Sequence, residues 1–342
     1  MLRFDSDYME GCHTDILNNL VEANFEKNTG YGLDVHTMHA KELIKESFDL
    51  PNDSLVYLLS GGTITNKTLI NSVLRGYECV ISPDTGHIQT HEAGAVEAMG
   101  TKIVTLKNND GKISADQVSK YMDTYLEDNG NIHLTVPKMV YITFPTETGT
   151  LYTKKELVEL KKACEKYNLF VFIDGARLGY GLVSPMCDID TKEIKDICDF
   201  FYIGGTKVGA LFGEALVVIN KENAPHLFTS IKRNGALLSK GFVTGIQFET
   251  LFTNNLYFEI SKNAVKQSLK IKDALVKKGY KLYCDSYTNQ QFIIINQKKK
   301  EELKDKLSYT SWGYDEDNNE IIRLVTSWAT TDKDVDELIN LF

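Results

Sequence analysis

Two short apolar segments in the middle of the chain each end at polar residues that could do chemistry. The first, residues 169–173, leads to Asp174 and Arg177, and the second, residues 200–203, leads to the glycine-flanked Lys207. Ligands of α/β sheets bind outside the carboxyl ends of the strands, so we expect these side chains to meet at one edge. A lysine that forms a Schiff base, together with an acid that keeps a pyridine nitrogen protonated, suits an enzyme that uses pyridoxal phosphate.

Each of these residues also has an ordinary structural explanation. Asp174 could cap a helix, Arg177 could lie at the surface, and Lys207 could be solvated, as most lysines are. Lys207 is the hardest to explain in this way, because it lies within the segment GGTKVGALFG. Glycines on both sides allow a close backbone approach to a ligand, and apolar neighbours would lower the pKa of the amine.

Length and composition limit the class of protein. The 342 residues can bury a large core and leave room for two domains. The net charge of −9 argues against nucleic acid as the main partner. No apolar run reaches the roughly 20 residues that span a bilayer, and the N-terminal segment lacks the apolar core of a signal peptide. The six cysteines form no CxxC pair, which predicts reduced thiols in a cytoplasmic protein and no metal site.

The elements that must position the polar residues follow an alternating pattern. Strands are expected at residues 53–59, 77–81, 102–106, 138–144, 169–173, 200–203 and 214–219, with helices at 37–48, 64–74, 91–99, 114–126 and 153–167. Ser114 has the character of an N-cap, and Thr153 and Glu156 have the spacing of a capping box. The alternation predicts a doubly wound, mostly parallel sheet with helices on both faces.

The pattern changes after residue 241. Residues 244–274 read as one long or broken helix, and a smaller α+β domain is expected from strands at 291–295 and 321–325 and a charged helix at 298–306. We therefore divide the chain into an N-terminal arm (residues 1–40), a large domain (41–245) and a small C-terminal domain (246–342).

Three further positions have more than one explanation. Gly62 and Thr63 follow a predicted strand and begin a helix, an arrangement that places free backbone N–H groups around a phosphate, although the GK[ST] ending of a P-loop is absent. His87 could stack on a planar cofactor or be a loop histidine bonded to the backbone. Arg323 interrupts an apolar strand, so it either faces an anion or lies on an edge strand that faces water.

Six segments together resemble the low-specificity threonine aldolases. These enzymes belong to the β-eliminating lyase group of fold type I, or aspartate-aminotransferase-like, pyridoxal phosphate enzymes. The segments are FDSD near the start, GGTxxN, TGHIxxHEAGA, FIDGARL, the Gly-Thr-Lys that contains Lys207, and RLVTSW. The resemblance covers residues 4 to about 245 and returns at residues 323–328. It implies a fold type I large domain with a small C-terminal domain, in homodimers or homotetramers whose active sites lie at subunit interfaces.

The resemblance also implies roles for the matching residues. Lys207 would form the Schiff base with pyridoxal 5'-phosphate, Asp174 would pair with the pyridinium nitrogen, and His87 would stack on the ring. The remaining cofactor-binding residues would be Gly62, Thr63, Arg177 and Thr206, and the carboxylate of an amino-acid substrate would be held by Ser6, Arg177 and Arg323. Tyr31 lies in a loop that approaches the substrate in this family.

The chain departs from the family pattern at two places. Many members carry a histidine in an N-T-H motif, proposed to handle the proton of the β-hydroxyl, where this chain has Pro145-Thr146-Glu147. Glu147 or His91 is therefore expected to act as the base. The basic residue that contacts phosphate from the partner subunit is not obvious either, and the candidates are Lys232, Arg233 and Lys240.

The implied activity is cleavage of threonine, allo-threonine or related β-hydroxy amino acids to glycine and an aldehyde. A β-eliminating lyase, or another amino-acid enzyme on the same fold, is the first alternative. A non-catalytic binding protein that kept the fold is the second. Turnover of a panel of amino acids would separate the three, whereas the sequence decides neither the preferred diastereomer nor dimer against tetramer.

Overall fold

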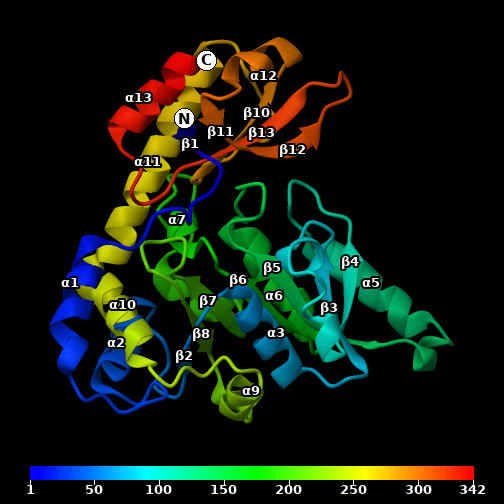
Figure 1. Cartoon of the computed structure of the whole chain (residues 1–342). Helices are drawn as coiled ribbons and strands as arrows, with labels where there is room; N and C mark the ends of the chain where they lie inside the picture. The colour runs from blue at the N-terminus through cyan, green and yellow to red at the C-terminus, as the bar shows by residue number, and fades with distance from the viewer.

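A seven-stranded sheet forms the body of the computed structural model, which describes residues 1–342 (Figure 1). Its strands, in spatial order, are β2 (Leu55–Leu59), β8 (Glu214–Val218), β7 (Phe200–Gly204), β6 (Phe170–Asp174), β5 (Val136–Thr143), β3 (Glu78–Pro83) and β4 (Lys102–Leu106). Only β8 runs against its neighbours, β2 and β7. The predicted mostly parallel α/β sheet is therefore confirmed.

Helices cover both faces of this sheet, and a separate apolar core lies on each face. The helices of the body are α3 (Gly62–Val73), α4 (His87–Thr90), α5 (Ala115–Glu127), α6 (Lys154–Lys166), α7 (Leu178–Leu182), α8 (Ile194–Ile197) and α9 (Leu227–Arg233). Strand β6 shows how one sequence serves both cores. Val171 and Ile173 belong to one core and Phe172 to the other, because successive side chains of a strand point to opposite faces. The predicted caps are also confirmed, since Ser114 and Thr153 begin α5 and α6 with capping boxes.

The N-terminal region contains more helix than the sequence analysis predicted. Helix α1 (Thr14–Glu22) was not expected, although its apolar residues recur at helical spacing, and α2 (Val35–Ser47) begins at the cap Asp34. Both helices pack on α10 (Phe242–Phe252). Of the two predicted forms, one long helix or a broken one, the structure has the broken one. The break lies before α11 (Leu256–Lys277), because Asn254 and Asn255 adopt positive φ angles.

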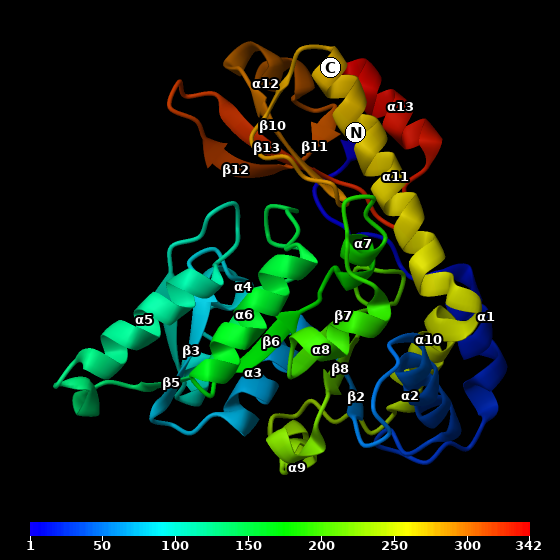
Figure 2. The same cartoon turned by 180° about the vertical axis from the view of Figure 1, so that it is seen from behind.

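A four-stranded sheet lies above the body, and the long helix α11 connects the two (Figures 1 and 2). Its strands, in spatial order, are β12 (Thr310–Tyr314), β13 (Glu320–Val325), β10 (Gln290–Ile295) and β9 (Lys281–Leu282). Helices α12 (Gln297–Leu303) and α13 (Asp332–Leu341) accompany it. Strand β1 (Leu2–Arg3) pairs with β11 (Leu307–Ser308), so both chain ends lie at the top of the molecule.

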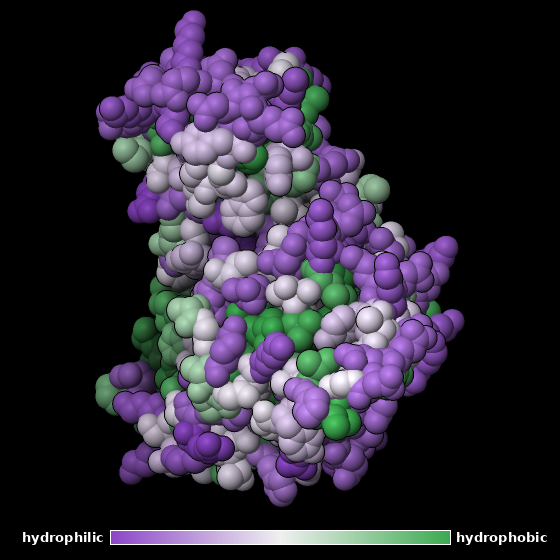
Figure 3. Space-filling view, turned by 90° about the vertical axis from the view of Figure 1, so that its right-hand side faces the viewer, coloured by the Kyte–Doolittle hydropathy of each residue, from purple (hydrophilic) through white to green (hydrophobic).

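A third apolar core belongs to this upper part, and it includes Phe4 of the arm. The separate cores agree with two domains, although the change from one core to the other lies between Val265 and Ile271, inside α11. The division of the chain near residue 245 stays a prediction. The surface of the upper part is largely hydrophilic in the view of Figure 3, whereas apolar side chains gather on the body below. No helix is both long and apolar enough to cross a membrane.

One predicted helix is wrong. Residues 91–99 were expected to be helical, but α4 ends at Thr90 and only Glu97–Met99 form a short 3-10 helix. Ala93 and Gly94 both have positive φ angles, which a right-handed helix cannot contain. The helix that the spacing predicted is thereby replaced by a loop that carries Glu92 back toward His87.

Candidate active site

A cleft of about 500 Å³ lies between the carboxyl ends of the large sheet and the small sheet. It is lined by Arg3, Asp5, Ser6, Tyr8, Met9, His87, His91, Glu147, Arg177, Lys207, Thr310, Trp312 and Arg323. The arm, the body and the small sheet all contribute, so the cleft unites most of the predicted site residues. Three larger hollows, of about 580, 580 and 510 Å³, lie elsewhere and contain none of these residues.

Asp174 ends strand β6 and is only 1% exposed. Tyr141 Oη and Asn66 Nδ2 both donate to its Oδ2, at 2.6 and 2.9 Å, and the backbone N–H of Ala176 donates to Oδ1 at 3.0 Å. A residue that only capped the following turn would not need the two side-chain donors. The arrangement instead surrounds a buried carboxyl group with three donors and fixes its position, as a partner for a cation would require.

A chain of hydrogen bonds connects Asp174 to His87. Asn66 Nδ2 also donates to Glu92 Oε1 at 2.8 Å, and His87 Nδ1 lies 2.9 Å from the same oxygen. Glu92 therefore fixes the orientation of the His87 ring, as a carboxylate partner commonly does. The alternative of a loop histidine bonded to backbone is wrong. The ring of His91 lies 5.5 Å from that of His87, and burial, followed by the charge of His87, lowers the pKa of His91.

Lys207 follows β7 in a loop that passes very close to the loop after β6. A Cβ atom at Gly204 would lie 2.1 Å from the carbonyl oxygen of Ala176, so only glycine fits there. Burial, and then the charge of Arg177, lower the pKa of Lys207, whereas the carboxylates of Asp7 and Asp174 oppose that effect. The solvated-lysine explanation is therefore wrong, and the amine is one that can act as a nucleophile.

Glu214 is a buried acid beside this lysine that the sequence analysis missed. Gly205 N–H donates to its Oε2 at 3.1 Å and Thr206 Oγ1 donates to its Oε1 at 2.9 Å, so Glu214 holds the two residues that precede Lys207. Burial raises the pKa of Glu214 to about 8. The signal in the sequence was a single acid at the start of an apolar strand. The hydroxyl of Thr206 is already engaged here, and its contact with phosphate stays a prediction.

Glu147 follows β5 and reaches the cleft from the side of the body. Thr143 Oγ1 donates to its Oε1 at 2.5 Å, while its Oε2 is buried and has no hydrogen-bond partner. Burial raises the pKa of Glu147 to about 7. A carboxyl group with one free oxygen and a pKa near neutrality can both accept and return a proton.

Arg177 is not a surface residue, because it forms a two-pronged ion pair with the arm. Its Nε and Nη2 donate to Asp7 Oδ2 and Oδ1, at 2.6 and 2.9 Å. This leaves Nη1 as the one guanidinium nitrogen of Arg177 without a hydrogen-bond partner. A full bidentate grip of Arg177 on a substrate carboxylate is therefore not what this structure provides.

Arg323 lies on β13, a central strand of the small sheet, so the edge-strand explanation is wrong. Its guanidinium donates only to neutral oxygens at 3.3 Å, those of Gln290, Asp5 and Thr310, and it has no carboxylate partner. Burial, and then the charge of Arg177, lower its pKa to about 10. A buried guanidinium that lacks a carboxylate is suited to take one from a ligand.

Of the two remaining residues predicted to bind substrate, Ser6 lines the cleft and Tyr31 does not. The hydroxyl of Ser6 is buried in the cleft wall without a hydrogen-bond partner, so it is free to contact a ligand. Tyr31 does not line the cleft of its own chain and instead lies beneath the amine of Lys232, at 4.4 Å from the ring centre. Its contact with substrate stays a prediction that a second chain would have to fulfil.

The residues at the start of α3 are arranged to receive an anion. The backbone N–H groups of Gly62, Thr63 and Ile64 make no hydrogen bond within the chain, and they point out of the first turn of the helix. Together with the amine of Lys207 in the cleft and the buried carboxylate of Asp174, they fit the phosphate, aldehyde and pyridine nitrogen of pyridoxal phosphate. The body of one chain thus offers a complementary group for each of these three parts of the cofactor.

Comparisons with known proteins agree with this geometry. The model of a family described as Beta-eliminating lyase matches residues 4–301. The structure of Leishmania major threonine aldolase has a TM-score of 0.95 and 38% identity, covering 100% of this chain and 98% of that one. Low specificity L-threonine aldolase of Pseudomonas aeruginosa is 29% identical over 240 residues, 70% of this chain and 68% of the relative. Aspartate aminotransferase of Thermus thermophilus shares the fold, with a TM-score of 0.70 at 13% identity, covering 100% and 91% of the two chains.

Proposed function

The chain belongs to the beta-eliminating lyase family, and from this premise we propose that it cleaves threonine and related β-hydroxy amino acids to glycine and an aldehyde. The family and its fold type I relatives depend on pyridoxal phosphate, and the cleft contains groups that fit this cofactor. The observation that carries the proposal is the half-buried Lys207 in one cleft with the acid Glu147 and with Arg323, which has no carboxylate partner.

The cofactor would be held by residues of four elements. Lys207 would bind its aldehyde carbon, Asp174 its pyridine nitrogen, and His87 the face of its ring, while the N–H groups of Gly62 and Thr63, with Thr206, would bind its phosphate. When bound, pyridoxal phosphate supplies a sink for the electron pair released when a bond to the α-carbon breaks. Asp174 maintains that capacity, because its negative charge keeps the facing nitrogen protonated.

Glu147 is the group best suited to take the proton of the substrate β-hydroxyl. Its free Oε2 and its pKa of about 7 allow it to accept this proton and later to return it. His91 is the second candidate, since its lowered pKa keeps the imidazole neutral at pH 7. Removal of the β-hydroxyl proton drives cleavage of the bond between the α- and β-carbons, so the base must lie on the side of the β-carbon.

Arg323 and Ser6 would hold the substrate carboxylate, with Nη1 of Arg177 beside them. Fixing the carboxylate fixes the rotation about the α-carbon, and this rotation decides which bond stands perpendicular to the cofactor ring and breaks. The same two arginines therefore bind the substrate and select the reaction.

A homo-oligomer located in the cytoplasm is part of the proposal. Tyr31 is exposed and does not line the cleft of its own chain, so a second chain could complete each site with this residue and with a cation for the phosphate. The apolar side chains of the N-terminal region support this, as they are strongly exposed: Leu17, Val21, Phe25, Tyr31, Leu33, Val35 and Met38. All six cysteines are free thiols, which suits a reducing compartment.

Borohydride reduction followed by peptide mapping tests the proposal at Lys207. We expect the yellow holoenzyme to lose its visible absorption on reduction, and the cofactor to remain attached to the peptide that contains Lys207. Lys207→Ala should retain no covalent cofactor, whereas Lys155→Ala, which changes an exposed lysine outside the cleft, should be labelled as the wild type is. A label on another lysine would contradict the assignment. A parallel panel of threonine, allo-threonine, phenylserine, serine and cysteine distinguishes aldol cleavage from elimination.

A further inference from the structure

The N-terminal arm places three consecutive residues between the two arginines of the cleft. The carbonyl oxygen of Asp5 accepts from Arg323 Nη2 at 3.3 Å, the hydroxyl of Ser6 has no partner, and the carboxylate of Asp7 takes the fork of Arg177. The arm therefore contacts the two guanidinium groups with different kinds of acceptor. Arg323 receives a neutral oxygen, and Arg177 receives a full negative charge.

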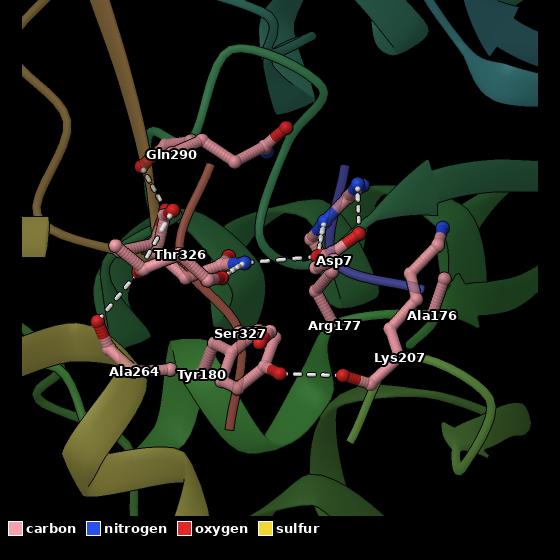
Figure 4. A network of polar contacts seen from close by, with 12 residues as sticks. Asp7, Ala176, Arg177, Tyr180, Lys207, Ala264, Gln290, Thr326 and Ser327 are labelled. Atoms are coloured by element: carbon pink, nitrogen blue, oxygen red, sulfur yellow. Dashed lines mark hydrogen bonds and ion pairs between the residues drawn. The ribbon is translucent and has the colours of Figure 1, made fainter. Parts of the chain in front are cut away.

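Asp7 is held so firmly that it cannot exchange this partner easily. It is 0% exposed, and Asn289 Nδ2 donates to its Oδ2 at 2.8 Å while also donating to the carbonyl oxygen of Thr326 at 2.9 Å (Figure 4). Burial raises the pKa of Asp7, but the charges of Arg177 and Lys207 outweigh it and keep the pKa below its ordinary value. Asp7 is thus a permanent anion that joins the arm, the body and the small sheet.

Several charged side chains of the cleft wall already have a partner of opposite charge. Arg3 pairs with the side chain of Asp5 at 2.9 Å, and Arg177 pairs with Asp7, so these four charges cancel. Lys207 is taken up by the cofactor under the proposed function. Arg323 is then the one guanidinium of the cleft without a carboxylate partner.

We propose that Asp7 is a specificity-determining residue that limits the site to amino acids with a single carboxylate, by neutralising Arg177 and leaving only Arg323 unbalanced. The inference rests on the proposed function, since it assumes that an amino acid enters this cleft. Once Arg323 holds the α-carboxylate, a second carboxylate on the substrate would find no guanidinium without a carboxylate partner and would share the cleft with the acid Glu147. The substrates would accordingly be β-hydroxy amino acids with an uncharged or apolar side chain.

Binding of L-asparagine and L-aspartate to the holoenzyme tests the inference, because the two have nearly the same shape and differ in charge. Neither has a β-hydroxyl, so binding can be followed as a change in cofactor absorbance without cleavage. We expect the wild type to bind L-asparagine at least about tenfold more tightly than L-aspartate. In Asp7→Asn, which frees Arg177, the ratio of the two dissociation constants should fall by about tenfold. In Glu10→Gln, which removes an exposed charge from the same arm, the ratio should stay at the wild-type value.

Equal binding of both ligands by the wild type would overturn the inference, and so would an unchanged ratio in Asp7→Asn. If Asp7→Asn does not hold the cofactor, the wild-type ratio decides alone. A merely structural role of Asp7 would weaken both ligands together and leave their ratio unchanged, which also counts against the inference. Discrimination against L-aspartate in a wild type that does not cleave threonine would contradict the proposed function but support this inference.

Discussion

At the scale of single residues, the cleft contains ionisable groups whose surroundings have moved their pKa values in useful directions. The pKa of Lys207 is lowered, which makes its amine easier to deprotonate, and that of Glu147 is raised to about 7, so this carboxyl can exchange a proton near neutral pH. In each case burial is the largest cause. The same cleft that excludes water from the substrate thereby prepares its nucleophile and its base.

Glu147→Gln tests the base at this scale. As a base, Glu147 must be deprotonated, so we expect kcat of the wild type to rise as the pH increases through about 7, the pKa of the buried carboxyl. Glutamine keeps the shape but cannot accept the proton, so kcat for threonine should fall by about 10²–10⁴-fold. The rise of kcat with pH near 7, which is the acid limb of the pH profile, should also disappear. The pH profile of kcat is the measurement. If His91→Asn removes the limb and Glu147→Gln keeps it, His91 is the base.

Arg323 gives the second test at the residue scale. Arg323→Lys keeps a charge but loses the planar fork that matches a carboxylate, so KM for threonine should rise while the cofactor spectrum stays normal. Arg323→Ala removes one partner of a buried charged pair, and kcat/KM should fall by about 2–5 kcal/mol. Steady-state kinetics with threonine measure both. Unchanged kcat/KM in the two variants would show that Arg323 does not touch the substrate.

At the scale of elements, local signals decide where helices begin, and the helices then carry the site. The N-terminus of α3 presents N–H groups to the proposed phosphate, and the segments that follow β5, β6 and β7 carry the cleft residues Glu147, Arg177 and Lys207. Strands and helices therefore supply the positions, and the loops supply the chemistry. A substitution at the cap of an outer helix should therefore lower the stability of the protein without changing its activity, since these caps do not touch the cleft.

Thr153→Ala makes this separation measurable. The hydroxyl of Thr153 accepts from the N–H of Glu156 at 3.2 Å and caps α6, and Thr153 does not line the cleft. Its loss should lower the free energy of unfolding by about 1 kcal/mol while kcat/KM stays the same. Denaturant unfolding of the holoenzyme provides the measurement. Thr124→Ala, an exposed threonine inside α5, is the matched control and should lower stability by less, because alanine is the better helix former. Equal losses in both variants would contradict the capping argument.

At the scale of the whole molecule, one chain carries a cleft and a separate apolar surface in its N-terminal region. Phe25 is 92% exposed and Val35 is 72% exposed, values that are unusual for large apolar side chains unless another molecule covers them. A second chain over this surface would also bring the loop of Tyr31 to another cleft. Association and activity are therefore expected to depend on each other.

The double variant Phe25→Glu, Val35→Glu tests this dependence. Buried carboxylates without partners would oppose association, so the mass in solution should fall toward that of one chain and the cofactor should dissociate more easily. Light scattering and the cofactor content after dilution are the measurements. Ile132→Glu introduces the same charge at another exposed apolar residue and should leave both unchanged. Dissociation by Ile132→Glu alone would place the interface elsewhere.

The sequence by itself determined the architecture and much of the cleft. The alternation of strands and helices follows from the local spacing of apolar residues. Asp174 and Lys207 were predicted at one edge of the sheet, because each follows a strand and parallel strands end on the same side. The capping residues of α5 and α6 were also readable, since a cap involves residues three apart. Helix α1 was missed within a polar region although its spacing was present, and the expected helix at residues 91–99 failed because a local pattern does not reveal left-handed residues.

Only the tertiary structure decided how the charges of the cleft are paired. Asp7 and Arg177 lie 170 residues apart in the chain, so no local pattern could show that the arm neutralises one arginine and spares the other. The burial of Glu214, the free oxygen of Glu147 and the chain of hydrogen bonds from Asp174 to His87 likewise depend on segments brought together by folding. Residue types are set by the sequence, but the charge of an ionisable group depends on its neighbours and its distance from water, which only the folded chain defines.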